Sequence, residues 1–227
     1  MMDVSPGLMD GDRYDVEIGL EPGSHVVLTN QSFTKVHPSV HIGAATNYRL
    51  RIGPGAILEY MPEPTIPYAG SRLDAFTQFK LSEGASLLCA DITTPGRTHR
   101  GEQFQYSRLS AVTEILRGGQ LVGYDHIQLI PSVHRFLSIG AFEHYTHHGV
   151  FWIFSGQADD RLLEQIRAAL PPQPSDSLLC GASLAAEQGI IVRMLGRSAW
   201  ELQAVCSDIW AICRGHLWGY PPCNLRK

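Results

Sequence analysis

The feature that most constrains the fold of this chain is a pattern of paired apolar runs that recurs three times in its first half. Each copy contains an alternating apolar run, a turn with glycine, and a second apolar run. The turn glycines are Gly23, Gly55 and Gly84, which lie 32 and 29 residues apart. A strand-rich repeat of this length predicts units that stack side by side and share one core.

The apolar runs have the period of two that is typical of strands with one buried face, as in Val16 with Ile18. A less exact fourth copy surrounds Gly118 and Gly119. We therefore expect stacked antiparallel strand pairs, which form either two packed sheets or a short solenoid-like β body. No helical pattern interrupts the strands before residue 158, which argues against a parallel α/β fold.

The second half of the chain adds helices to these strands. The sequence predicts a strand pair within residues 136–154, an amphipathic helix over 159–170 and a buried strand over 189–196. A longer helix is expected to begin at Ser198, where Ser198 and Glu201 fit a capping box.

These patterns together predict a mainly β fold with two or three α-helices in the C-terminal half. We expect a single domain over residues 1–227. Its β-repeat body would span residues 1–135, and residues 136–227 would add further strands and the C-terminal helices.

Composition and charge argue against several classes of protein. Hydrophobic residues make up 44% of the 227 residues and charged residues 18%, which is typical of a globular chain. The net charge of -4 gives no basic excess for nucleic acid. No apolar run reaches the roughly 18 residues of a membrane span, and no secretion signal is visible. The five cysteines include no Cys-x-x-Cys pair, so we expect buried free thiols and a cytoplasmic protein.

Five strings in the sequence carry a resemblance to a known family. They are Ser-Pro-Gly-Leu-Met-Asp-Gly-Asp at 5–12, Thr-Asn-Gln-Ser-Phe-Thr-Lys-Val-His at 29–37, Leu-Glu-Tyr-Met-Pro-Glu-Pro-Thr-Ile-Pro-Tyr-Ala-Gly-Ser at 58–71, Ala-Asp-Ile-Thr-Thr-Pro-Gly-Arg at 90–97, and Ile-Val-Arg-Met-Leu-Gly at 191–196. In this order and spacing they resemble the urease accessory protein UreD (UreH) family, over nearly the whole chain.

The resemblance implies a β-dominated scaffold that assembles with the accessory proteins UreF and UreG on the urease structural subunits. In that family the GTPase UreG supplies nickel, and the UreD-like subunit carries it inward through an internal passage. The resemblance thus implies transient Ni²⁺, no tightly bound cofactor and no catalysis. Members usually carry further residues, with strands among them, before the Ser-Pro-Gly string. We therefore expect either that the start codon is mis-assigned or that one sheet lacks its edge strands.

Polar residues at the end of one predicted strand are candidates for contacting a partner or lining the passage. They are Gln31, Thr34, Lys35 and His37. Ordinary hydrogen bonding at a strand end is the alternative interpretation.

Asp91, Arg97 and Glu102 form a second candidate group, in and after another predicted strand. Arg97 could pair with either carboxylate across the loop, which would make the group a structural ion pair. The functional alternative is that the carboxylates are transient nickel contacts or face UreF.

A histidine-rich stretch at residues 143–148 suggests a metal contact, because imidazole suits Ni²⁺. We take His144 and His147 as the candidate ligands. On a strand, alternation leaves at most two histidines on one face, which suffices for a weak transit site but not for a closed one. Solvated or hydrogen-bonded histidines are the alternative.

Two other functions remain open beside the maturation scaffold. One is a β-fold enzyme that uses Asp91, Glu102 and a histidine as acid, base or metal ligands. The other is a β-rich interaction module without metal traffic. No nucleophile elbow, His-Glu-x-x-His helix or phosphate-binding glycine loop occurs in the sequence, so we expect no enzyme.

Overall fold

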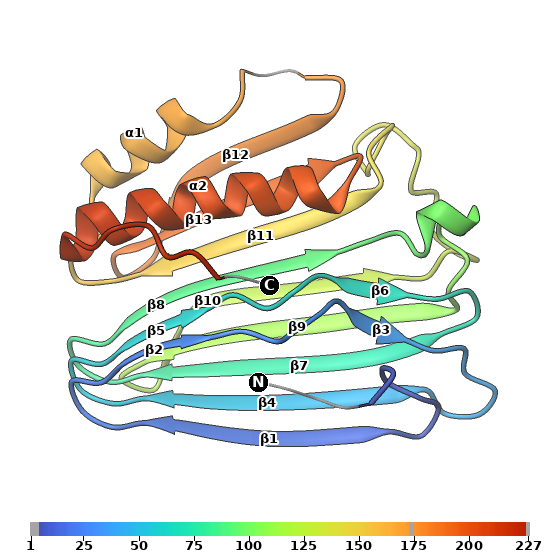
Figure 1. Cartoon of the computed structure of the whole chain (residues 1–227), viewed down its shortest axis with the longest axis horizontal. Coiled ribbons are helices and arrows are strands. Elements are labelled where there is room, and N and C mark those ends of the chain that lie inside the picture. Colours follow the sequence, from blue (N-terminus) through green and yellow to red (C-terminus); the bar gives the residue numbers. More distant parts are fainter. Residues whose placement is uncertain (1–4, 173–174, 226–227) are drawn as a thin grey trace.

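The computed structural model describes residues 5–172 and 175–225, and its body consists of two sheets packed face to face (Figure 1). Sheet B contains, in spatial order, β1 (Arg13–Leu20), β4 (Ala44–Ile52), β7 (Arg72–Leu81), β9 (Arg108–Arg117) and β10 (Gln120–Leu129). Sheet A contains β12 (Leu178–Ala185), β13 (Gly189–Gly196), β11 (His147–Phe154), β8 (Ser86–Thr93), β5 (Ile57–Tyr60) and β2 (His25–Leu28), with the short β3 (Thr34–Val36) and β6 (Thr65–Pro67) beside it.

Successive copies of the sequence repeat stack as a solenoid. Each copy gives its first strand to sheet B and its second to sheet A, so β1, β4 and β7 pair in parallel, as do β2, β5 and β8. The turn glycines Gly23, Gly55 and Gly84 have φ angles of 68°, 64° and 68°, a region that favours glycine. The amide of Gly23 donates to the Pro54 carbonyl at 2.9 Å, and that of Gly55 to the Glu83 carbonyl at 3.0 Å. The turns therefore stack through their own hydrogen bonds.

The prediction of a mainly β fold with two packed sheets and solenoid-like stacking is confirmed. The prediction of antiparallel pairing within each copy is wrong for the first three copies, because their turns carry the chain from one sheet to the other. The fourth copy does form an antiparallel hairpin, which joins β9 to β10 at Gly118 and Gly119. The strand pair expected within 136–154 is also wrong, since turns precede the single strand β11 there.

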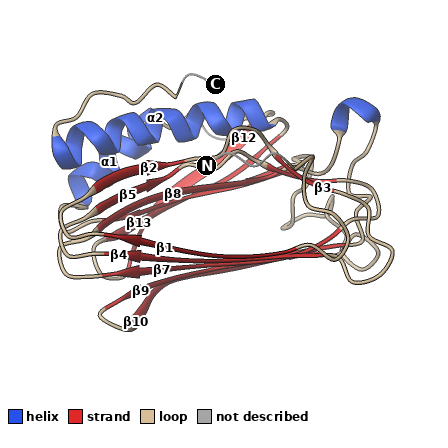
Figure 2. Ribbon diagram, turned by 60° about the horizontal axis from the view of Figure 1, so that its bottom comes forward, coloured by secondary structure: helices blue, strands red, loops and turns tan. Residues whose placement is uncertain are grey.

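Two helices, α1 (Asp160–Ala169) and α2 (Ala199–Trp218), lie on the outer face of sheet A (Figure 2). Asp159 caps α1 by accepting the Leu162 amide at 2.8 Å. Helix α2 begins after Ser198 as predicted, but the Ser198 hydroxyl donates to the Glu201 carboxylate at 2.6 Å instead of capping the backbone. Among the described residues, no helix is long and apolar enough to cross a membrane.

The space between the sheets is layered along the strands. An apolar cluster that includes Leu50 and Phe79 fills the end near the inter-sheet turns. A second cluster, which includes Leu73 and Leu109, fills the opposite end. Between Leu73 and Phe79 on the inner face of β7 stands Thr77, so a polar layer separates the two apolar clusters. This layer positions the candidate site.

Candidate functional site

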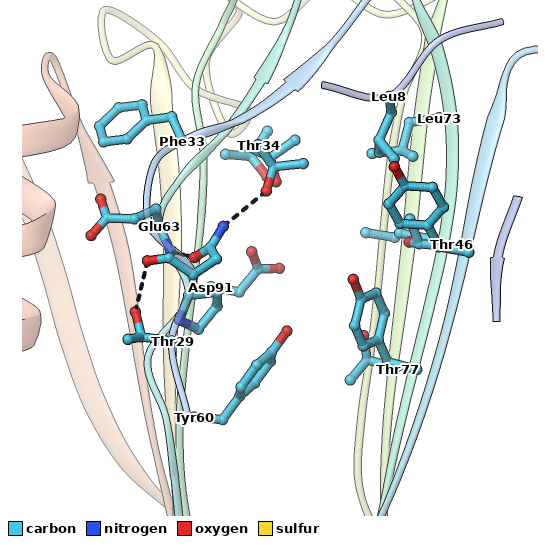
Figure 3. Close-up of a pocket in the computed structure, with 18 of the residues that line it drawn as sticks. Leu8, Thr29, Phe33, Thr34, Thr46, Tyr60, Glu63, Leu73, Thr77 and Asp91 are labelled. Carbon is cyan, nitrogen blue, oxygen red and sulfur yellow. Dashed lines mark hydrogen bonds between the residues drawn. The ribbon is translucent and has the colours of Figure 1, made fainter. Parts of the chain in front are cut away.

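A cavity of about 210 Å³ occupies the polar layer between the sheets. Sheet B lines it with Tyr48, Thr77 and Thr113, which are neighbours in the strand register. Sheet A faces them with Tyr60 of β5 and Asp91 of β8 (Figure 3). The interior of a two-sheet body is normally apolar, because buried polar groups lose their hydration. A polar layer at this depth therefore indicates a function other than core packing.

The segment between β2 and β3 closes one side of the cavity. The Asn30 side chain orders this segment, since its amide donates to the Thr34 hydroxyl at 3.3 Å and its oxygen accepts the Glu63 amide at 2.6 Å. Gln31 lines the cavity from this segment, and Thr34 and Lys35 line it from β3. The strand end predicted from sequence to hold passage residues is thus part of the cavity wall.

Asp91 gives the cavity its electrostatic character. The carboxylate points into the space between the sheets (Figure 3). Burial raises the pKa of Asp91 to about 6, and the negative charge of Asp125 adds to the increase. At neutral pH the group is mainly ionised, so the cavity holds a poorly hydrated negative charge, which favours the approach of a cation.

This charge has a cost in stability that Asp91→Asn is expected to remove. In the unfolded chain Asp91 ionises near pH 3.8 and in the folded chain near pH 6, so the folded state binds an extra proton between these values. The stability of the parent protein therefore falls as pH rises through this window. Asp91→Asn is expected to raise the free energy of unfolding by up to roughly 2 to 3 kcal/mol above pH 6 and by much less at pH 4. Urea denaturation at both pH values measures this, and an equal effect at both would contradict it.

Four of the predicted site residues, Gln31, Thr34, Lys35 and Asp91, meet at the cavity. The other three partner or passage candidates form a separate cluster around Tyr68. This cluster contains His37, whose ring centroid lies 5.0 Å from that of Tyr68, Arg97, whose guanidinium lies 4.0 Å from the same ring, and Glu102.

The ion pair expected across the 97–102 loop is present between Arg97 and Glu102, with the Arg97 Nε to Glu102 Oε2 distance at 2.8 Å. The same carboxylate accepts the Ala69 amide at 3.2 Å. Both hydrogen bonds lower the pKa of Glu102, and the one from Arg97 has the larger effect. Asp91 is not part of this pair, so the two carboxylates have different environments.

The structure places His144 and His147 in different environments. His144 lies in an exposed turn, with its ring centroid 4.0 Å from that of Tyr145. His147 is buried in β11, where its Nδ1 bonds the Thr146 hydroxyl at 2.9 Å and burial lowers its pKa to about 4. It shares the face of β11 that packs under the helices, whereas His148 faces the other sheet, as strand alternation predicts. A nickel role for this pair stays a prediction.

No tight metal site is visible in the described part of the chain, where no three His, Cys, Asp or Glu side chains gather around one point. The five cysteines are free, and Cys89 lines the cavity. Burial raises the pKa of Cys89 well above the ordinary value, so its thiol stays protonated and is a poor metal ligand. The side-chain oxygens that line the cavity belong to carboxylate, amide and hydroxyl groups.

Several cavity residues were missed from the sequence. The threonines Thr46, Thr77 and Thr113 and the tyrosines Tyr48 and Tyr60 occupy inward positions of strands that otherwise read as apolar. One pattern in the sequence could have revealed them. A residue with a hydroxyl group interrupts the apolar alternation at the same position of successive repeats, because Tyr48, Thr77 and Thr113 are aligned in the strand register.

The model of the family described as UreD urease accessory protein matches residues 1–227. The chain belongs to the UreD family. It is 32% identical to the urease accessory protein UreD of Acetivibrio thermocellus over 206 residues, which cover 90% of this chain and 78% of that protein. It is 31% identical to the UreD of Lachnoclostridium phytofermentans over 204 residues, 89% of this chain and 73% of that protein. The UreD of Staphylococcus aureus strain JH9 is 32% identical over 168 residues, 73% of this chain and 60% of that protein. Membership of the UreD family supports a role in urease maturation.

Proposed function

We propose that this UreD-family chain is a non-catalytic scaffold in the cytoplasm that binds UreF, UreG and the urease structural subunits and passes Ni²⁺ through the cavity between its sheets. Family membership supports the maturation role. The observation that carries the nickel passage is the ionised Asp91 carboxylate in a hydroxyl-lined layer between two apolar clusters.

The chemistry of the cavity suits a cation in transit better than a resident one. Oxygen ligands from Asp91, Thr77 and the tyrosines can replace part of the water around Ni²⁺. No three His, Cys, Asp or Glu side chains of the described residues converge there, and neutral hydroxyls are weak ligands, so the ion can leave again. A passage requires this, because an ion held by three or more strong ligands would stay.

The remaining candidates fit around this passage. Gln31, in the segment before β3, and Thr34 and Lys35 of β3 form part of its wall. His37, with the Arg97–Glu102 pair, forms a polar cluster that suits a partner contact at the same end of β3. His144 and His147 would give transient nickel contacts from two different environments, an exposed turn and the buried start of β11.

Co-expression with the urease structural and accessory genes tests the proposal. Urease purified from cells without this chain is expected to contain little nickel and to have low activity, and the chain should restore both. The variant Thr77→Phe distinguishes a nickel passage from a scaffold without one, because the larger side chain fills the cavity without changing its charge. Its matched control is Lys80→Phe, at an exposed position of the same strand. Full nickel loading with a folded Thr77→Phe protein would exclude the passage and leave the scaffold alone.

A further inference from the structure

The polar layer extends beyond the cavity to the side of the two-sheet body where β10 forms the edge of sheet B. Asp125 of β10 is the register partner of Thr113, which lines the cavity. In sheet A the register runs from Asp91 through Val150 of β11 to Arg193 of β13. Register partners point to the same face of a sheet. Asp125 and Arg193 therefore both face the space between the sheets. Asp125 lies one strand beyond the cavity wall in sheet B, and Arg193 lies two strands beyond it in sheet A.

Asp125 and Arg193 join the two sheets across this side. Arg193 Nη2 lies 2.8 Å from Asp125 Oδ1. The Asp125 side chain is 17% exposed and that of Arg193 is 51% exposed, so the carboxylate lies inside and the guanidinium covers it from solvent. A pair with one partner this exposed contributes little to folding, which means that it can open without disturbing the sheets.

His148 lies between this pair and Asp91. It stands on the inner face of β11, two residues before Val150, and interacts electrostatically with both Asp125 and Arg193. Its imidazole is a ligand type that suits divalent transition-metal ions. Asp91 and Asp125 also repel each other. A cation that bridged the gap between the two carboxylates would relieve this repulsion.

We infer that the Asp125–Arg193 ion pair closes a lateral mouth of the cavity, and that a divalent metal cation moves between Asp91 and the protein surface by displacing Arg193 from Asp125, past His148. The Arg193 guanidinium pairs with the Asp125 carboxylate until a metal cation competes for the same oxygen atoms. When Arg193 swings out, Asp125 becomes an oxygen ligand at the opening. The inference rests on the proposed function for the identity of the ion, and on the register of Asp125 with Thr113 of the cavity wall for the position of the mouth.

Cysteine labelling of the full chain tests the mouth. Thr113→Cys places a thiol on the cavity wall beside Asp125, and a small cationic methanethiosulfonate reagent reports how readily solvent reaches it. Peptide mass spectrometry separates this thiol from the native cysteines. Adding Arg193→Gln is expected to raise the labelling rate about fivefold or more, because the cover of the mouth is lost. Arg193→Lys, which keeps the charge, and Arg51→Gln, which breaks an exposed pair with Glu17 elsewhere, are expected to leave the rate near that of the parent.

Nickel chloride tests the cation. Ni²⁺ is expected to slow labelling of the Arg193→Gln protein, and a further Asp125→Asn change should remove that protection. Equal rates with and without Arg193→Gln, an equal increase with Arg51→Gln, or no protection by Ni²⁺ would each overturn the inference. Labelling needs neither urease nor a partner protein, so a failed mouth and a failed role in urease maturation are separate results.

Discussion

Glu59→Ala is expected to lower the free energy of unfolding by about 3 to 5 kcal/mol, the range for removing one partner from a buried charge network. The Glu59 side chain is fully buried on the outer face of β5. Its carboxylate accepts hydrogen bonds from the Trp210 indole and the Arg214 guanidinium of α2, and it bonds the His25 ring of β2. Alanine would leave three polar groups without their partner, one of them a nearly buried cation, since Arg214 is 11% exposed.

The same cluster fastens the C-terminal segment. The Tyr220 ring stacks on His25 with a centroid distance of 5.4 Å, and Arg214 Nε donates to the Pro221 carbonyl at 2.8 Å. Loss of Glu59 is therefore expected to loosen α2 together with the residues that follow it. Hydrogen exchange should then increase in α2 more than in β7, which lies in the other sheet.

Urea denaturation of the parent, Glu59→Ala and Glu59→Gln measures the effect. Glu59→Gln keeps one carbonyl acceptor and should fall between the other two. The matched control is Glu17→Ala, which removes the partner of Arg51 in a pair with both side chains exposed, at 57% and 63%. That change is expected to cost less than about 1 kcal/mol. A Glu59→Ala protein as stable as Glu17→Ala would show that the cluster does not hold α2 in place.

The second large effect is expected in function. Asp91→Asn should lower nickel-dependent activation of co-expressed urease about tenfold or more, a change in barrier of about 1.4 kcal/mol or more. The amide keeps the shape of the side chain but removes the charge of the Asp91 carboxylate, which points into the space between the sheets (Figure 3). Because the same change is expected to stabilise the fold at neutral pH, a loss of activation would not arise from unfolding.

The control for this experiment is Asp74→Asn, which makes the same chemical change on the outer face of sheet B, where Asp74 pairs with Arg108. Urease activity and nickel content per subunit are the measurements. Unchanged activation by Asp91→Asn, with normal levels of the variant protein, would remove the cavity carboxylate from the nickel route.

Much of the fold follows from local patterns in the sequence. The glycines at 23, 55 and 84 require a backbone conformation that other residues avoid, so their spacing marked the turns of the solenoid. Apolar periodicity likewise predicts α1, and the capping-box pattern predicts the start of α2 at Ser198. The alternation of buried positions in a strand does not say which sheet the strand joins. For this reason the pairing within each copy was predicted as a hairpin, whereas the turns lead to the other sheet.

The candidate site, like the fold, was only partly predictable from the sequence. The sequence singled out Gln31, Thr34 and Lys35 in one group and Asp91 in another, and these four residues line one cavity. It gave no sign of Asp125 or Arg193, which are 68 residues apart and meet only because β10 and β13 lie in facing sheets.

The sequence by itself determined the strand-turn repeat, the two C-terminal helices, the UreD family and part of the cavity wall, because each of these depends on residues that are close together in the chain. Tertiary structure alone decided which strands pair, that Arg97 bonds Glu102 and not Asp91, and that the polar layer crosses from one sheet to the other. The physical reason is that the energy of a buried charge depends on what faces it across the core, and that is set by packing between segments far apart in sequence.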